Sequence, residues 1–252
     1  MSKVIVVGGS TGIGLLVVRK ALLDSADEVI VFDRNLGMAL AGMKNSYPSR
    51  LTAIEVQINK AVDWGLFSSD IDEVRSIVYV IPACKSRDPS ANDLGYTPQF
   101  SENISSVNLS LLELVATVRQ KLIDPSSIVL VSSVLATRVA VQDASLDYHV
   151  SKAVLDSIMR YLAVKLAPRC SVNCVAPGLI ARDESSALLR DEITSNRVRK
   201  SVPLGRPSSQ EEVAKLLWSL CAGELSYVTG QTIIMDGGSS VLETYSTSLR
   251  YE

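Results

Sequence analysis

Seven short apolar runs, separated by helical patterns, constrain the fold of this chain more than any other feature. Most runs are continuous rather than alternating, which is typical of parallel strands covered on both faces. The runs span residues 3–7, 28–32, 52–58, 76–81, 127–133, 171–176 and 231–235. Helical patterns occupy residues 12–25, 101–122, 147–168 and 208–223. This order predicts a single α/β domain over residues 1–252, a Rossmann-type doubly wound parallel sheet of about seven strands with helices on both faces.

Size and composition fit one such domain and exclude several other classes of protein. The chain has 252 residues, 47% of them hydrophobic, which is enough for a sizeable core. Its formal net charge of -2 gives no argument for nucleic acid or an anionic membrane as a partner. No apolar run approaches the ~20 residues of a membrane span, and a signal-peptide pattern is lacking. We therefore expect a cytoplasmic protein with no nucleic-acid or membrane partner.

The cysteines and the single histidine do not form a metal-binding pattern. Cys84, Cys170, Cys174 and Cys221 include no C-x-x-C pair, and His149 is the only histidine. A zinc site needs two close pairs or a Cys/His cluster. We expect no metal, reduced and buried thiols, and a structural or exposed His149.

The glycine-rich stretch VIVVGGSTGIG at residues 4–14 joins the first predicted strand to the first predicted helix. Its glycines, Gly8, Gly12 and Gly14, do not follow the general G-x-G-x-x-G dinucleotide pattern. Glycine permits a close backbone approach, and a helix N-terminus presents free N–H groups to an anion such as pyrophosphate. The loop alone leaves two interpretations open, a phosphate cradle and a plain strand-to-helix turn.

An acidic residue, Asp33, follows the second predicted strand, 19 residues after Gly14. Its carboxylate is placed to accept hydrogen bonds from the adenosine ribose of a dinucleotide, and it would repel a 2′-phosphate. Asp33 therefore favours NAD, as does a glycine loop without Lys or Arg. The adjacent Arg34 favours NADP instead, and a solvated turn is the alternative interpretation of Asp33.

Two further segments carry polar residues suited to catalysis. Tyr148 and Lys152 are four residues apart, so they share one face of a helix. A nearby ammonium lowers the pKa of a tyrosine, which makes Tyr148 a candidate general acid/base, although this spacing is common on helix surfaces. Ser132 and Ser133 end the fifth predicted strand, where a hydroxyl can hydrogen-bond a substrate carbonyl. Asn108 lies inside a predicted helix and is a candidate to hold a kink or a water.

These features, followed by VNCVAPGLI and YVTGQTIIMDGG, resemble the compact single-domain branch of the short-chain dehydrogenase/reductase family over nearly the whole chain. The resemblance implies a nicotinamide cofactor that carries the hydride. It implies that Tyr148 exchanges a proton with the substrate oxygen and that Lys152 binds the nicotinamide ribose. The same resemblance implies that Ser133 orients the substrate oxygen, with Ser132 as the alternative candidate, and that Asn108 holds a proton-relay water.

The resemblance also implies NAD as the cofactor, with NADP as the alternative, and a set of residues that bind it. Glycines of the loop would hold the pyrophosphate, and a proline–glycine turn would lie beside the nicotinamide. The set comprises Gly8, Ser10, Thr11, Gly12, Ile13, Gly14, Asp33, Arg34, Gln57, Ile58, Pro82, Tyr148, Lys152, Pro177, Gly178 and Ile180.

Several positions depart from the family pattern. Val7 stands where the glycine loop usually has a threonine, and IPAC at residues 81–84 replaces N-N-A-G. Gln57 replaces an acidic residue, Arg182 replaces a threonine, and the serine–tyrosine spacing of 15 residues is longer than usual. Because the chemistry-bearing residues are kept, we expect an active, specialised enzyme with weakened cofactor affinity.

The family resemblance implies an NAD(P)(H)-dependent oxidoreductase that interconverts a secondary alcohol and a ketone by hydride transfer. Two alternatives stay open, an epimerase or dehydratase of the same fold and a non-catalytic nucleotide-sensing or regulatory protein. Dehalogenases of this type commonly have arginine in place of Lys152, which argues against that activity. Residues 179–207 stand where the family carries its substrate lid. The cations from Arg197 to Lys200 predict either an anionic substrate or a solvated lid helix.

The helical segments 101–122 and 147–168 resemble the pair that forms the family's dimer interface, and the strand at 231–235 resembles part of a second interface. We therefore expect a homodimer or a homotetramer. The tail at residues 241–252 extends past the usual core and is a candidate to cover a neighbouring subunit's site.

Overall fold

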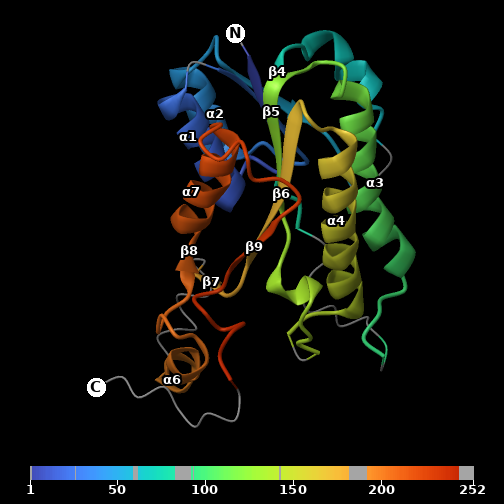
Figure 1. Cartoon of the computed structure of the whole chain (residues 1–252). Coiled ribbons are helices and arrows are strands. Elements are labelled where there is room, and N and C mark those ends of the chain that lie inside the picture. Colours follow the sequence, from blue (N-terminus) through green and yellow to red (C-terminus); the bar gives the residue numbers. More distant parts are fainter. Residues whose placement is uncertain are drawn as a thin grey trace.

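The computed structural model describes residues 2–25, 27–58, 62–82, 92, 94–141, 143–181 and 192–243. Its centre is a seven-stranded parallel sheet in the order β3-β2-β1-β4-β5-β6-β9 (Figure 1). The strands are β1 (Lys3–Val7), β2 (Glu28–Asp33), β3 (Leu51–Glu55), β4 (Val74–Tyr79), β5 (Leu122–Val131), β6 (Cys170–Pro177) and β9 (Thr232–Met235). Each strand overlaps one of the predicted runs, which confirms the predicted fold class.

Helices cover both faces of this sheet, as Figure 1 shows. The first layer holds α1 (Gly12–Asp24), α2 (Gly37–Ser46) and α7 (Gln210–Cys221), and the second holds α3 (Phe100–Val118) and α4 (Leu146–Lys165). Smaller elements are the 3₁₀ helices η1 (Trp64–Asp70) and η2 (Val134–Ala136), the helix α6 (Glu192–Ser201), and a separate pair of strands, β7 (Ile180–Ala181) and β8 (Ser208–Ser209).

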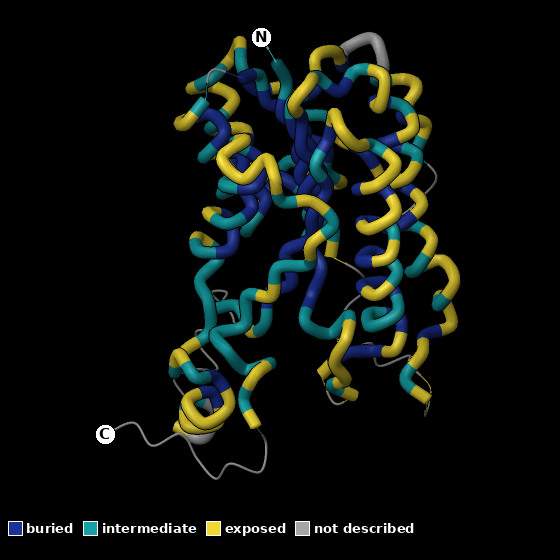
Figure 2. The backbone as a smooth tube through the Cα atoms, in the orientation of Figure 1, coloured by how far each residue is buried: buried dark blue, intermediate teal, exposed yellow. Residues whose placement is uncertain are grey.

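Side chains that alternate along each strand build two apolar layers, one on each face of the sheet. Ile5 and Val7 belong to the layer shared with α3 and α4, whereas Val4 and Val6 belong to the layer shared with α1 and α7. Figure 2 shows the buried backbone concentrated in the sheet, between helices with exposed outer faces. Burial on both faces explains why the strand sequences are continuously apolar.

The predicted helix at residues 101–122 ends earlier than expected, at Val118. The next strand begins at Leu122, which pairs with Val74, although the apolar run starts only at residue 127. Before residue 127, Leu122 pairs with β4 and Ser126 pairs with Cys170 of β6, so the strand includes a segment that the apolar run does not. Pairing with neighbouring strands here outweighs the local sequence preference.

The strand order reverses between β1 and β4, which makes this boundary the switch point of the sheet. Open α/β sheets bind their ligands at the carboxyl ends of the strands beside such a point. The glycine loop follows β1, and the predicted catalytic serines follow β5. Parallel pairing therefore brings both to the same edge of the sheet.

Candidate active site

The glycine loop joins β1 to α1 and requires glycine at two of its positions. Gly8 has φ +83°, and a Cβ on it would lie 2.5 Å from the Val80 carbonyl oxygen. A Cβ on Gly14 would lie 2.0 Å from the Gly8 carbonyl oxygen. The loop therefore folds tightly against the first turn of α1, where free backbone N–H groups favour an anion.

Asp33, the last residue of β2, is hydrogen-bonded to the backbone of the glycine loop. Its Oδ2 accepts a hydrogen bond from Ser10 N at 3.0 Å, and its Oδ1 accepts one from Arg34 N at 2.8 Å. Ser10 Oγ is buried and has no hydrogen-bond partner among the described residues. An unpaired buried hydroxyl at a helix N-terminus, beside a carboxylate, fits the phosphate and the ribose of a dinucleotide. The residues present therefore fit the cofactor that the family resemblance implies.

Lys152 reaches from α4 to the carboxyl ends of two neighbouring strands. Its Nζ donates to the carbonyl of Val131 at 2.9 Å, at the end of β5, and to that of Ile81 at 3.3 Å, just beyond β4. The same Nζ lies 5.8 Å from the centre of the Tyr148 ring. Because Lys152 is only 3% exposed, the two carbonyls hold a buried cation beside the phenol. The structure thus places Tyr148 and Lys152 side by side on α4, as their four-residue spacing predicts.

Ser132 and Ser133 follow β5 at the same edge of the sheet. Ser133 begins η2, and its Oγ accepts a hydrogen bond from Leu135 N at 3.2 Å. An accepting hydroxyl keeps its own proton available for donation. Ser132 Oγ is buried and lacks a hydrogen-bond partner within the described part of the chain. The 3₁₀ helix η2, which follows these two serines, packs against α4, the helix that carries Tyr148.

Asn108 lies inside α3, which is continuous from Phe100 to Val118. Its Nδ2 donates to the Ile104 carbonyl at 2.8 Å and to Ser151 Oγ on α4 at 3.2 Å. Its Oδ1 is buried without a partner among the described residues, which suits it to accept from a water. Tyr79 Oη donates to the adjacent Val107 carbonyl at 2.7 Å and ties α3 to β4, and burial raises the pKa of Tyr79 well above its usual value.

The remaining predicted cofactor residues lie in segments that follow strands at this edge. Thr11, Gly12 and Ile13 open α1, Gln57 and Ile58 follow β3, Pro82 follows β4, and Pro177, Gly178 and Ile180 lie at or after the end of β6. Gly178 packs closely on Asp236, the residue after β9, because a Cβ on Gly178 would lie 2.8 Å from Asp236 Cβ. The contacts of these residues with a cofactor stay predictions.

The sequence reasoning missed two contributors to the site. Gln210, at the start of α7, places its side-chain oxygen 2.9 Å from where a Cβ on Gly12 would lie, so its amide borders the glycine loop. The carbonyls of Val131 and Ile81, which hold Lys152, are the second contributor. No sequence pattern marks a backbone carbonyl, and Gln210 is brought to the loop only by the packing of α7 beside α1.

Parts of the predicted substrate lid and several departures lie outside the described residues. These are Cys84 of the IPAC stretch, Arg182 with the rest of residues 182–191, and the tail at 244–252. Within α6, Arg197, Arg199 and Lys200 are exposed, whereas Val198 is buried. Within the described part of the lid, α6 therefore exposes its cations to solvent, whereas Val198 on α6 and Val202 just after it are buried.

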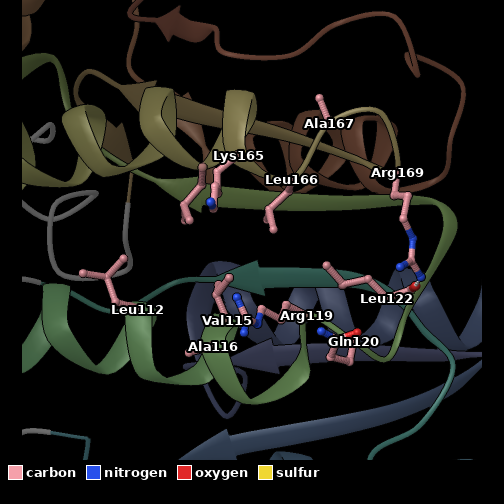
Figure 3. A pocket seen from close by; sticks show the side chains of 11 residues that line it. Leu112, Val115, Ala116, Arg119, Gln120, Leu122, Lys165, Leu166, Ala167 and Arg169 are labelled. Carbon is pink, nitrogen blue, oxygen red and sulfur yellow. Dashed lines mark hydrogen bonds between the residues drawn. The ribbon is translucent and has the colours of Figure 1, made fainter.

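A separate cavity of about 330 Å³ lies between the C-terminal ends of α3 and α4 (Figure 3). Its lining combines apolar residues such as Leu112 and Leu166 with the cations Arg119, Lys165 and Arg169. These helix ends precede β5 and β6, so the cavity lies at the edge of the sheet opposite to Tyr148 and is not part of the site. Among the described residues, no His/Cys/Asp/Glu group could hold a metal ion, and no helix is long and apolar enough to cross a membrane.

A parallel sheet with a glycine loop at its switch point, and with the buried Lys152 beside the half-buried Tyr148 at the same edge, defines a Rossmann-type oxidoreductase class. A family model described as Enoyl-(Acyl carrier protein) reductase matches residues 10–240 of the chain. The chain therefore belongs to the short-chain dehydrogenase/reductase family, whose members are oxidoreductases with a nicotinamide cofactor, NAD or NADP.

Individual relatives agree with this assignment over nearly their whole lengths. Dehydrogenase/reductase SDR family member 4 of Sus scrofa is 29% identical over 252 residues, with 95% of this chain and 88% of that protein covered. Dehydrogenase/reductase SDR family member 2, mitochondrial, of Homo sapiens is 29% identical over 247 residues, with 94% and 86% covered. A solved structure named Short-chain dehydrogenase/reductase SDR:Glucose/ribitol dehydrogenase from Brucella melitensis has a TM-score of 0.78 at 25% identity, covering 94% of this chain and 96% of that one.

Proposed function

We propose that this chain is an NAD(H)-dependent oxidoreductase that interconverts a secondary alcohol and a ketone. The observation that carries the proposal is the buried ammonium of Lys152, which strand carbonyls hold beside Tyr148 at the edge where the glycine loop lies. A cation beside a phenol stabilises the phenolate form, which a tyrosine acid/base must pass through.

Each polar residue at this edge has a role in the proposed reaction. The bound nicotinamide would supply or accept the hydride. Tyr148 exchanges a proton with the substrate oxygen. Ser133 donates a hydrogen bond to the same oxygen, and Ser132 is the alternative candidate for this role. Lys152 stabilises the phenolate and binds the nicotinamide ribose. The buried Oδ1 of Asn108 accepts from a water that would relay the proton between Tyr148 and solvent.

Asp33 is the reason for proposing NAD rather than NADP. Its carboxylate stands at the end of β2 against the glycine loop, where it accepts from ribose hydroxyls and repels a 2′-phosphate. The neighbouring Arg34 is exposed and keeps NADP as the alternative. The same proposal gives cofactor contacts to Gly8, Ser10, Thr11, Gly12, Ile13, Gly14, Gln57, Ile58, Pro82, Pro177, Gly178 and Ile180.

Assembly, location and substrate charge are further parts of the proposal. The outer faces of α3 and α4 expose apolar side chains, and we propose that they form the interface of a homodimer or a homotetramer. These side chains are Leu109, Leu112, Tyr161 and Val164. We place the protein in the cytoplasm. For the substrate, one form of the proposal is an anionic molecule that binds the exposed cations of α6.

The experiment that tests the proposal starts with a thermal-shift comparison of NAD, NADH, NADP and NADPH. We expect the NAD pair to raise the Tm more than the NADP pair. A panel of secondary alcohols and ketones, followed by NADH absorbance, should then reveal turnover. Binding of NADH with no turnover of any substrate would support the nucleotide-sensing alternative, and neither binding nor turnover would overturn the proposal.

A further inference from the structure

Asp147, the residue before Tyr148, ties the first turn of α4 to the connection between β4 and α3. It is fully buried, at 0% exposed. Its Oδ1 accepts from Thr97 N at 3.1 Å, and its Oδ2 accepts from Thr97 Oγ1 and from Asn103 Nδ2, the latter at 2.9 Å. A buried carboxylate costs free energy unless donors satisfy it, and here three donors converge on it.

His149, the residue after Tyr148, ties the same turn to the connection between β5 and α4. Its Nε2 accepts a hydrogen bond from Ala140 N at 3.1 Å, and its Nδ1 lies 2.7 Å from the Ser145 carbonyl oxygen. Because a backbone N–H can only donate, Nε2 carries no proton in this contact, and Nδ1 donates to Ser145. The histidine therefore bridges two backbone groups as a neutral ring of one tautomer.

The connection that His149 holds is the one that carries Ser133. It is longer than the family usually has, since 15 residues separate Ser133 from Tyr148. Arg138 on this connection also donates to the Ser239 carbonyl at 3.0 Å, beyond the end of β9. The long connection is thus held at one point to the C-terminal part of the chain and at another to the helix of Tyr148.

We propose that Asp147 and His149 are positioning residues for Tyr148, which they hold by fixing the first turn of α4 to the loops on either side. This inference rests on the proposed function, because it takes Tyr148 as the acid/base. Lys152, one turn further along α4, is held independently by strand carbonyls. Loss of either tie therefore moves the phenol relative to a fixed ammonium, and a misplacement of about 1 Å can cost about 10²-fold in rate.

Asp147→Asn tests the first tie, because an amide N–H₂ in place of Oδ2 can no longer accept from Thr97 Oγ1 and Asn103 Nδ2, so at least one of these partners must reorient. We expect kcat to fall roughly ten- to a hundredfold, with KM for NADH unchanged. Asp27→Asn is the matched control, since Asp27 is 6% exposed and pairs with Arg75 at the opposite edge of the sheet. The control should lower the Tm and leave kcat intact. Wild-type kcat in Asp147→Asn, measured where the protein is folded, would overturn this part of the proposal.

Two substitutions of His149 separate its two contacts. The amide of His149→Gln reaches the place of Nε2 and can still accept from Ala140 N, whereas the amide of His149→Asn reaches only the place of Nδ1. We expect His149→Asn to lower kcat and His149→Gln to restore most of the loss. Equal activity of the two variants, whether high or low, would show that the contact with Ala140 does not position Tyr148.

A readout that needs no turnover separates this inference from the proposed function. In protein labelled with ¹³C-tyrosine, the Tyr148 signal, assigned with Tyr148→Phe, should differ between His149→Asn and His149→Gln, which both lose the ring whose centroid lies 6.5 Å from that of Tyr148, and it should shift in Asp147→Asn but not in Asp27→Asn. Shifted signals in a protein that turns over no substrate would support the positioning and overturn the oxidoreductase proposal. Unshifted signals alongside normal turnover would overturn the positioning alone.

Discussion

Lys152 and Tyr148 face each other across one turn of α4, with the ammonium nitrogen 5.8 Å from the centre of the phenol ring. The carbonyls of Val131 and Ile81 fix the lysine at the ends of two central strands. Asp33 and the glycine loop lie at the same edge, next to the switch point between β1 and β4. The parallel topology thus gathers, at one edge, residues that the sequence spreads over more than half of the chain.

Asp33→Ala should weaken the binding of NADH and reduce the preference for NADH over NADPH. The substitution removes the carboxylate that would bind the ribose, and it also removes the acceptor of Ser10 N in the glycine loop. Hydrogen bonds to a charged group are worth about 1.5–3 kcal/mol, which corresponds to a Kd about ten- to a hundredfold higher. Fluorescence titration measures both Kd values. Glu55→Ala, at the exposed end of the neighbouring β3, is the control, and an unchanged NADH Kd in Asp33→Ala would reject the role of Asp33.

The stability of the α7 N-terminus should depend on pH through Glu212. Two hydrogen bonds from the Arg206 guanidinium, together with one from Ser209 N in a capping box, lower the pKa of Glu212 from 4.5 to about 2. A pKa that is lowered by folding gives stability that is present above the unfolded value and is lost as the pH falls toward about 2.

Melting curves of wild type and Glu212→Gln measure this contribution. The Tm difference between them should be largest near neutral pH and should shrink as the pH is lowered from about 4.5 to about 2. Glu211→Gln, one residue earlier in the same turn, keeps the hydrogen bonds of Arg206 and Ser209 to Glu212 and serves as the control. A Tm difference that stays constant over this range would contradict the assignment.

The three described cysteines should resist thiol reagents in the folded protein. Burial raises the pKa of Cys170 to about 11 and that of Cys221 to about 12, and it also raises the pKa of Cys174. Because the thiolate is the reactive form, these buried thiols should stay unlabelled at about pH 8 until the protein is unfolded in denaturant. Peptide mapping identifies the labelled positions, and rapid labelling of Cys170 or Cys221 in the native protein would count against the described core.

Val164→Glu should shift the protein to a smaller assembly. Val164 is 81% exposed on the outer face of α4, close to other exposed apolar residues of the proposed interface. A buried unpaired charge at an interface is costly, so the substitution should favour the monomer. Light scattering after size-exclusion chromatography gives the mass. Met38→Glu on α2, which is 93% exposed, is the control, and a wild-type mass for Val164→Glu would place the interface elsewhere.

The fold and the chemistry-bearing residues could be predicted because their signals are local. Continuous Val/Ile runs indicate buried parallel strands, and a four-residue spacing places Tyr148 and Lys152 on one helical face. The start of β5 could not be predicted in this way, since Asp124, Pro125 and Ser126 interrupt its apolar sequence, and the pairing of the strand with β4 and β6 begins before the apolar run.

The proposed roles of Asp147 and His149 could not be predicted from the sequence either. Each depends on a partner in a distant loop, Thr97 for Asp147 and the backbone N–H of Ala140 for His149. The sequence alone predicts a structural or exposed His149, whereas the structure shows its ring hydrogen-bonded to two backbone groups. Contacts with backbone groups leave no pattern in the residue types, so only the folded chain reveals them.

Tyr148→Phe tests the central claim most directly, because it removes one oxygen and leaves the ring. Lys152 donates to strand carbonyls, so its position does not depend on the hydroxyl that is lost. We predict that kcat falls about 10²–10⁴-fold while the Kd for NADH stays unchanged. Tyr227→Phe, at a fully exposed tyrosine, is the control and should behave as wild type. A Tyr148→Phe variant that retains wild-type kcat would contradict the account.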